Sequence, residues 1–255
     1  TVLAHVTPFV SGTSADIRLA ALHAVTHLGN AEAVPVLVRE FEKADDAGRA
    51  AIERCLSRLP GAEVNRAMVE LLTESSTSQV RTALIAVLVE RQAYDTMPIL
   101  LDLVRDEDQR VRVEAVKAAG ALCGGDTVPI LVAALSAAEG TQERRAIEDA
   151  LVAIARRPGN YQTTTAKIAE AMSDAKSQAR ASLLRILGRL GGAQALDAVR
   201  DHLKDEEPTV RQAAIRVLGA WPDASPLGDL RTAAREAENV QIKILALRGF
   251  ANLYR

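Results

Sequence analysis

An arginine recurs along the chain at a nearly fixed spacing, and an apolar pattern with helical periodicity follows it each time. The successive gaps, counted to a lysine in the eighth place, are 31, 32, 31, 32, 36, 31 and 32 residues. A repeat period of roughly 20–50 residues indicates a solenoid or a related array, because each unit buries its apolar face only against its neighbours. The repeated positions are Arg18, Arg49, Arg81, Arg112, Arg144, Arg180, Arg211 and Lys243.

Each repeat is predicted to contain two helices. Apolar residues recur four and seven residues after the arginine, which places them on one face of the second helix. In the fourth repeat we expect a first helix over 95–105 and a second over 108–122. Pro98 and Pro129 lie 31 residues apart, in the first turn of successive first helices, where proline is well tolerated. No segment shows the two-residue alternation of a half-buried strand.

These hairpins predict an all-α, right-handed α-solenoid of about eight two-helix repeats, forming a single domain over residues 1–255. The one long gap predicts a longer loop around 156–162. We interpret this loop as a surface insertion, with a bend in the solenoid or a partner contact through Tyr161 as alternatives. The approximate repeats are 1–29, 30–60, 61–92, 93–124, 125–158, 159–191, 192–223 and 224–255.

The sequence resembles the short bacterial HEAT-like repeats of the armadillo-type class, which are related to those of phycobilisome lyases. The residues that carry the resemblance are Asp205, Pro208, Val210-Arg211, Ala213-Ala214 and Val217-Leu218-Gly219, with partial copies at Asp106, Val111-Arg112, Asp174 and Arg180. The resemblance covers the full chain. The last three repeats are also similar to HEAT segments of large multidomain bacterial proteins, where such segments often accompany sugar-processing or electron-transfer domains.

The resemblance implies a structural ladder of charged residues. In that family an aspartate before the second helix pairs with the arginine at its start and links stacked repeats. Here the aspartate and arginine are six residues apart where both are present, while Lys43 and Ala138 occupy the aspartate position in other repeats. A partly buried guanidinium can satisfy several carbonyl groups and a carboxylate together. The predicted ladder residues are Arg18, Arg81, Asp106, Arg112, Asp174, Arg180, Asp205 and Arg211.

Charge is segregated between the two layers of helices, although the formal net charge is only −2. The first helices of repeats two to eight carry a net charge of −10, and the remainder of the chain carries +8. In this fold class the second helices usually line the concave surface, so a concave, basic groove is expected. Cations recur five and nine residues after the repeat arginine, one helical turn apart, with interruptions at Ala86 and Asp149. An ordinary solvated face is the alternative interpretation. This basic stripe comprises His23, His27, Arg54, Arg58, Lys117, Arg185, Arg189, Arg216 and Arg248.

The basic stripe favours a protein or peptide partner with an acidic surface, or an adjacent domain of the same parent chain. Nucleic acid is disfavoured, because the pI is about 6.1 and no aromatic residue recurs along the stripe for base stacking. The final helix has apolar residues on more than one side, which indicates that Arg255 abuts another repeat, another domain or a second copy. No apolar run approaches the roughly 18 residues of a membrane span. The compartment stays open between cytoplasm and export as part of a larger protein.

No catalytic, cofactor or metal site is expected. His23 and His27 are four residues apart, but the intervening residues lack the glutamate of the zinc-protease motif. Cys55 and Cys123 are predicted to be buried free thiols. We therefore predict a non-catalytic protein-binding scaffold. The alternatives are an accessory region of a larger multidomain bacterial enzyme, and a HEAT-like lyase, chaperone or nucleic-acid-binding protein.

Overall fold

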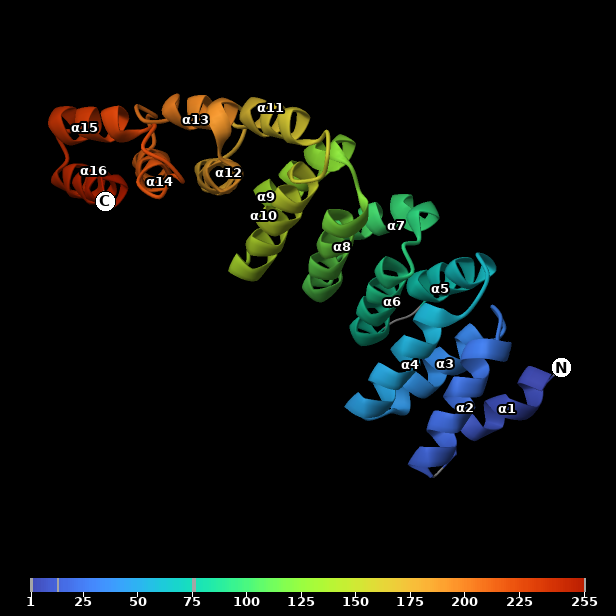
Figure 1. Ribbon diagram of the computed structural model, residues 1–255. Helices are drawn as coiled ribbons and strands as arrows, with labels where there is room; N and C mark the ends of the chain where they lie inside the picture. Colours follow the sequence, from blue (N-terminus) through green and yellow to red (C-terminus); the bar gives the residue numbers. More distant parts are fainter. Residues whose placement is uncertain (1, 13, 75–76, 255) are drawn as a thin grey trace. The chain divides into compact units, whose positions relative to one another are not determined.

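The computed structural model describes residues 2–12, 14–74 and 77–254. Over these ranges it contains sixteen α-helices, three short 3-10 helices and no strand, which confirms the predicted all-α solenoid of helical hairpins. The chain divides into two compact units, Thr1–Leu122 (unit 1) and Cys123–Arg255 (unit 2). The helices of each hairpin are antiparallel neighbours along the chain (Figure 1). The single repeat domain over 1–255 stays a prediction.

Unit 1 consists of two layers of helices. The second helices of its hairpins, α2, α4, α6 and α8, pack against one another in chain order, and α1, α3 and α5 form the other layer (Figure 1). The bounds are α1 (Val2–Val10), α2 (Ala15–Leu28), α3 (Ala33–Lys43), α4 (Asp46–Arg58), α5 (Glu63–Glu74), α6 (Ser78–Glu90), η1 (Tyr94–Thr96), α7 (Met97–Asp102), η2 (Leu103–Arg105) and α8 (Gln109–Leu122).

Unit 2 repeats this arrangement. The second helices α10, α12, α14 and α16 pack in order, and α9, α11 and α13 pack in order beside them. The bounds are η3 (Gly125–Thr127), α9 (Val128–Ala137), α10 (Thr141–Ala155), α11 (Tyr161–Ala171), α12 (Ser177–Leu190), α13 (Gly192–Arg200), α14 (Pro208–Leu218), α15 (Leu227–Glu236) and α16 (Val240–Leu253).

The periodic apolar positions form the core between the two layers. The residue seven places after each repeat arginine is buried in the first seven hairpins and half-buried in the last. Burial of these side chains is what makes neighbouring hairpins stabilise one another, since no hairpin could exclude water from both faces alone. The seven buried residues are Val25, Leu56, Leu88, Ala119, Leu151, Leu187 and Leu218.

The first helix of the fourth hairpin differs from the prediction of one continuous helix over 95–105. It is a short α-helix, α7, with 3-10 turns before and after it. Pro98 has no N–H to donate to the carbonyl of Tyr94, so an α-helical bond is missing there. The Met97 N–H bonds to Tyr94 instead, which gives the tighter 3-10 geometry. The second helix begins at Gln109, one residue later than expected.

The longer loop lies between α10 and α11 and ends at Asn160, since Tyr161 is already helical. Its side chains bond within unit 2. The Tyr161 hydroxyl donates to the carbonyl oxygen of Gly191, and the Arg157 guanidinium donates to that of Cys123. The Tyr161 hydroxyl, the alternative candidate for a partner contact, therefore joins this loop to the following hairpin.

Candidate functional site

Two arginines of the predicted ladder hold a carboxylate from the next hairpin. Nη1 of Arg180 donates to Oδ2 of Asp205 at 2.7 Å, and Nη1 of Arg81 donates to Oδ1 of Asp106 at 3.1 Å. Both carboxylates are largely shielded from water, with side-chain exposures of 6% and 13%. In each pair the arginine precedes its aspartate by 25 residues, so the contact crosses from one hairpin to the next. Asp174, another predicted ladder residue, is exposed.

The six-residue separation predicted for the ladder occurs as a bond to the main chain. Nη1 of Arg18, Arg112 and Arg144 donates to the carbonyl oxygen six residues earlier, at 3.0, 2.8 and 2.6 Å. Arg211 donates in the same way to the carbonyl oxygen of Asp205. These carbonyls lie at the end of the first helix, where intrahelical partners are missing. The arginine therefore closes the turn of its own hairpin.

Asp106 and Asp205 each accept a second hydrogen bond, from the main-chain N–H two residues ahead in the chain. The N–H of Asp108 donates to Oδ1 of Asp106, and the N–H of Glu207 donates to Oδ1 of Asp205, both at 2.9 Å. The ladder carboxylate thus sits in a repeated setting. A guanidinium reaches it from the preceding hairpin and a turn N–H from its own.

This setting controls the ionisation of Asp205. Burial by itself would raise the pKa of the carboxyl. Hydrogen bonds from His202 and the Glu207 N–H, together with the positive charge of Arg180, outweigh burial and hold the pKa of Asp205 below its ordinary value. The pKa of Asp106 is lowered against burial in a similar way. Both groups are therefore carboxylates at neutral pH.

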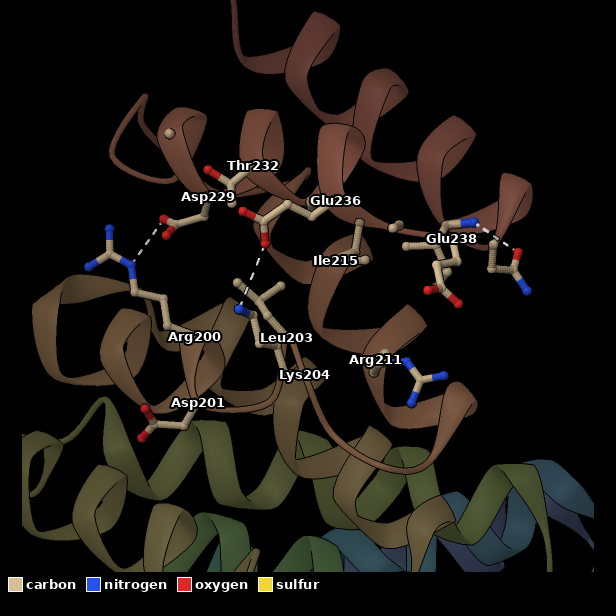
Figure 2. Close-up of a pocket in the computed structure, with 15 residues that line it drawn as sticks. Arg200, Asp201, Leu203, Lys204, Arg211, Ile215, Asp229, Thr232, Glu236 and Glu238 are labelled. Carbon is tan, nitrogen blue, oxygen red and sulfur yellow. Dashed lines mark hydrogen bonds and ion pairs between the residues drawn. The ribbon is translucent and has the colours of Figure 1, made fainter.

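The aspartate is missing at the junction between the seventh and eighth hairpins. Ala237 lies six residues before Lys243, the position that Asp205 occupies relative to Arg211. The main chain is similar at the two kinds of junction, with φ −64° and ψ 129° at Ala237 and φ −59° and ψ 152° at Asp106. A pocket of about 670 Å³ opens at this junction, and both Arg211 and Ala237 line it (Figure 2).

A second pocket coincides with another missing aspartate. In unit 1, the position that would serve Arg18 holds Lys43, and the two side chains line a pocket of about 550 Å³ between the first and second hairpins. At Asp106 and Asp205 the carboxylate bridges the two hairpins. The loss of the bridging side chain thus accompanies an open junction in each unit.

On one side of the unit 2 pocket, charged side chains form two pairs of opposite charge. Nε of Arg200 donates to Oδ2 of Asp229 at 3.0 Å, and Nζ of Lys204 lies 3.7 Å from Oε2 of Glu236 (Figure 2). Glu238 lies on the other side and is exposed. The pocket therefore combines charge pairs at one wall with less constrained charges at the opposite wall.

Arg211 lies at that opposite wall, beside an apolar floor. Leu203, Ile215 and Ile242 supply apolar lining, and Ile215 and Ile242 are buried. Figure 2 draws no contact between the Arg211 guanidinium and the other residues that line the pocket. Its Nη1 bonds to carbonyl oxygens of the preceding turn.

The basic stripe lies on exposed positions of the second helices. All nine side chains are exposed to solvent, although the two units carry separate parts of the set. Unit 1 carries the two histidines, Arg54, Arg58 and Lys117, and unit 2 carries the four remaining arginines. Arg216 and Arg248 form no ion pair within the described ranges; Nη2 of Arg216 donates to Gln212 at 3.3 Å.

Three members of the stripe pair with acidic side chains on the same face. Glu148 is the most buried of these acids, with 9% side-chain exposure, and it lies on α10 beneath Arg185. These contacts neutralise part of the positive charge that the sequence pattern indicates. The pairs are Lys117–Glu114, Arg185–Glu148 and Arg189–Asp149, with N–O distances of 2.9, 2.6 and 2.7 Å.

The family model for HEAT repeats matches residues 65–152 and 165–251, which together exceed half of the chain. The chain belongs to the HEAT repeat family. None of the curated proteins matches this HEAT repeat sequence.

Solved structures with similarity to this HEAT repeat protein share little sequence with it. Human deoxyhypusine hydroxylase in complex with glycerol is 19% identical, with 98% of this chain and 96% of that one covered and a TM-score of 0.39. The CpcE–CpcF complex of phycocyanin lyase from Nostoc sp. PCC7120 is 17% identical, with 97% of this chain and 86% of that one covered and a TM-score of 0.39. Importin beta is 14% identical, with 99% of this chain and 33% of that one covered and a TM-score of 0.46.

The histidines and cysteines of the HEAT repeats show no assembled centre. The rings of His23 and His27 contact edge to face, with centroids 4.8 Å apart. No group of three or more His, Cys, Asp or Glu side chains is placed to hold a metal ion within the described ranges. Cys55 and Cys123 are free and buried, and burial raises the pKa of the Cys123 thiol to about 11, so it is protonated at neutral pH. No helix in the described part has the length and apolar character to cross a membrane.

Arg91 links two HEAT hairpins and is not among the residues that the sequence pattern predicts to be important. Its Nε donates to Oδ1 of Asn65 at 2.6 Å, its Nη1 donates to the carbonyl oxygens of Leu56 and Leu59 at 3.1 and 2.6 Å, and its Nη2 donates to that of Gly61 at 3.1 Å. Arg91 does not recur at a fixed place in the repeats, so the period gives no signal for it. Arg255, which is predicted to abut another repeat, another domain or a second copy of the chain, lies outside the described residues.

Proposed function

We propose that this HEAT repeat protein is a non-catalytic scaffold that binds acidic polypeptide segments through the basic stripe, with the stripe facing a groove. The observation that carries the proposal is the exposure of Arg216 and Arg248 on neighbouring second helices without an ion-pair partner in the described ranges. Exposed cations on one face raise the local concentration of an anionic partner and steer its approach.

The ion pairs within the stripe limit the affinity that it can have for an acidic partner. Arg185 and Arg189 already contact Glu148 and Asp149, so a partner would gain less from them than from free cations. Exposed charges each contribute about 0.5 kcal/mol, and salt screens them. The interaction is therefore expected to be moderate and to weaken as ionic strength rises.

The test compares two double variants with the same change in net charge. Arg216→Gln with Arg248→Gln removes the two unpaired stripe cations of unit 2, and we expect the affinity for a fluorescein-labelled oligoglutamate peptide to fall about fivefold. The control, Arg231→Gln with Arg235→Gln, removes two exposed cations from the first helix α15 and should change the affinity less than about twofold. Arg185 is left intact, because its removal would leave the buried Glu148 unpaired.

Fluorescence anisotropy at low salt provides the affinities, with a single-stranded DNA of equal charge as a second probe. An equal loss in both double variants would show that net charge, and not the stripe, governs binding. Tighter binding of the DNA than of the peptide would contradict a polypeptide partner and favour nucleic acid.

A further inference from the structure

The junction between the seventh and eighth hairpins has the donors of the ladder without its carboxylate. Elsewhere, the guanidinium of Arg81 or Arg180 reaches an aspartate of the following hairpin. At this junction Arg211 occupies the arginine position, while Ala237 occupies the aspartate position with a similar main-chain conformation. Arg211 lines the pocket at this junction (Figure 2), and its Nη1 donates to the carbonyl oxygens of Asp205 and Glu206.

The second donor of the ladder setting is also at this pocket. In the filled junctions, the N–H two residues after the aspartate position donates to the carboxylate. The corresponding N–H belongs to Asn239, which lines the pocket with Arg211. A carboxylate that entered from outside could therefore meet a guanidinium and a main-chain N–H, the pair that Asp106 and Asp205 meet from within.

The remaining lining indicates what should surround that carboxylate. Leu203, Ile215 and Ile242 form an apolar floor, which suits aliphatic neighbours of the acidic group better than a free, fully hydrated anion. Of the acidic side chains at the pocket, Asp229 is held by Arg200. Glu238 lines the same pocket as Arg211 and is exposed, so its carboxylate would compete with a ligand carboxylate.

We propose that this pocket binds an aspartate side chain, flanked by apolar residues, from a partner polypeptide, and that this side chain completes the ladder at the seventh–eighth junction. None of the nine stripe residues lines this pocket, so the site goes beyond the scaffold function proposed for that stripe. The internal repetition carries the inference, because the same arginine position binds a carboxylate at two other junctions of the chain.

The decisive variant fills the pocket from within. Ala237→Asp supplies the missing carboxylate, so we expect the affinity for the peptide acetyl-Leu-Asp-Leu-amide to fall at least about tenfold. The completed ladder should also raise the thermal midpoint of unit 2 by about 3 °C, followed by the fluorescence of Trp221. Ala237→Asn has nearly the same size without the charge, and it should retain the affinity within about twofold.

NMR titration of the full chain, observing the Asn239 amide and the Arg211 guanidinium, gives both the site and the affinity. Replacement of aspartate by asparagine in the peptide, or Arg211→Gln in the protein, should weaken binding at least about tenfold. Glu238→Gln should tighten it about twofold by removing a competing charge. The Arg216→Gln and Arg248→Gln double variant should leave it unchanged, which separates this site from the stripe.

Three results would overturn the proposal. The first is an absence of peptide-dependent shifts at Asn239 and Arg211 in the unmodified protein. The second is equal affinity for the aspartate and asparagine peptides, or undiminished affinity in Ala237→Asp. The third is acetate binding as tightly as the peptide, which would make the pocket a site for small carboxylates.

Discussion

Asp205→Asn is expected to lower the free energy of unfolding of unit 2 by about 3 kcal/mol at neutral pH. The substitution keeps the size of the side chain but removes the charge that Arg180 and His202 contact. The carboxylate is 6% exposed, so water cannot replace the lost partner, and the guanidinium of Arg180 remains half-buried beside a neutral group. Urea unfolding followed by Trp221 measures the change, since this single tryptophan is buried in unit 2.

The ion pair between Asp205 and Arg180 also predicts how the free energy of unfolding depends on pH. The pKa of Asp205 is lower in the folded chain than its ordinary value, so the unfolded chain takes up the proton first on acidification. The stabilisation is therefore fully present above the ordinary pKa and is lost as pH falls through the lower, folded pKa. The difference between the unmodified protein and Asp205→Asn should shrink over that interval.

Asp174→Asn is the matched control for Asp205→Asn. Asp174 is another aspartate before a second helix of unit 2, but its side chain is exposed. The same chemical change there should alter the free energy of unfolding by less than about 0.5 kcal/mol. If both variants lost stability equally, burial and the contact with Arg180 would not be the cause.

The two-layer repeat could be predicted from sequence because one periodic signal determines both the helices and their stacking. Apolar residues at helical spacing mark a face, and a regular return of that face, as at Leu187 and Leu218, requires neighbours to cover it. The six-residue spacing of Asp205 and Arg211 was also visible. The sequence does not show which aspartate a guanidinium contacts, because the aspartate of its own turn and that of the next turn both lie within its reach once the hairpins stack.

At the candidate sites too, the sequence pattern predicts which side chains are exposed but not which side chains they contact. The exposure of Arg185 and Arg216 follows from their place on the helix, five residues after the repeat arginine. The neutralising contact from Glu148 does not follow, because the two side chains come from different helices, 37 residues apart. A sequence also shows that Ala237 replaces an aspartate, whereas the pocket depends on how closely two turns approach.

Gly219→Ala is expected to lower the free energy of unfolding of unit 2 by about 2–3 kcal/mol. Gly219 has right-handed helical main-chain angles at the C-terminal cap of α14, so the reduced freedom of the unfolded chain would by itself give a gain of up to about 1 kcal/mol. Gly219 directly follows α14, and a Cβ at this position would lie 2.7 Å from Cα of Gly249 on α16. Main-chain atoms cannot rotate away as a side chain can, so the two helices would have to separate and lose packing along their contact. Trp221 fluorescence during urea unfolding again measures the change.

Gly228→Ala controls for propensity, because no atom lies within 4 Å of a Cβ built at that position of α15. It should be neutral or stabilising by up to about 1 kcal/mol, and a loss comparable to that of Gly219→Ala would contradict the close approach as the cause.

Gly249→Ala meets the same contact from the other helix, with a Cβ 2.8 Å from Cα of Gly219. Once the first alanine has separated α14 from α16, the second should cost less, so the double variant should lose less stability than the two single losses combined. Full additivity would show that the two glycines act in independent surroundings, and that the close approach of Gly219 to Gly249 is not the cause of the lost stability.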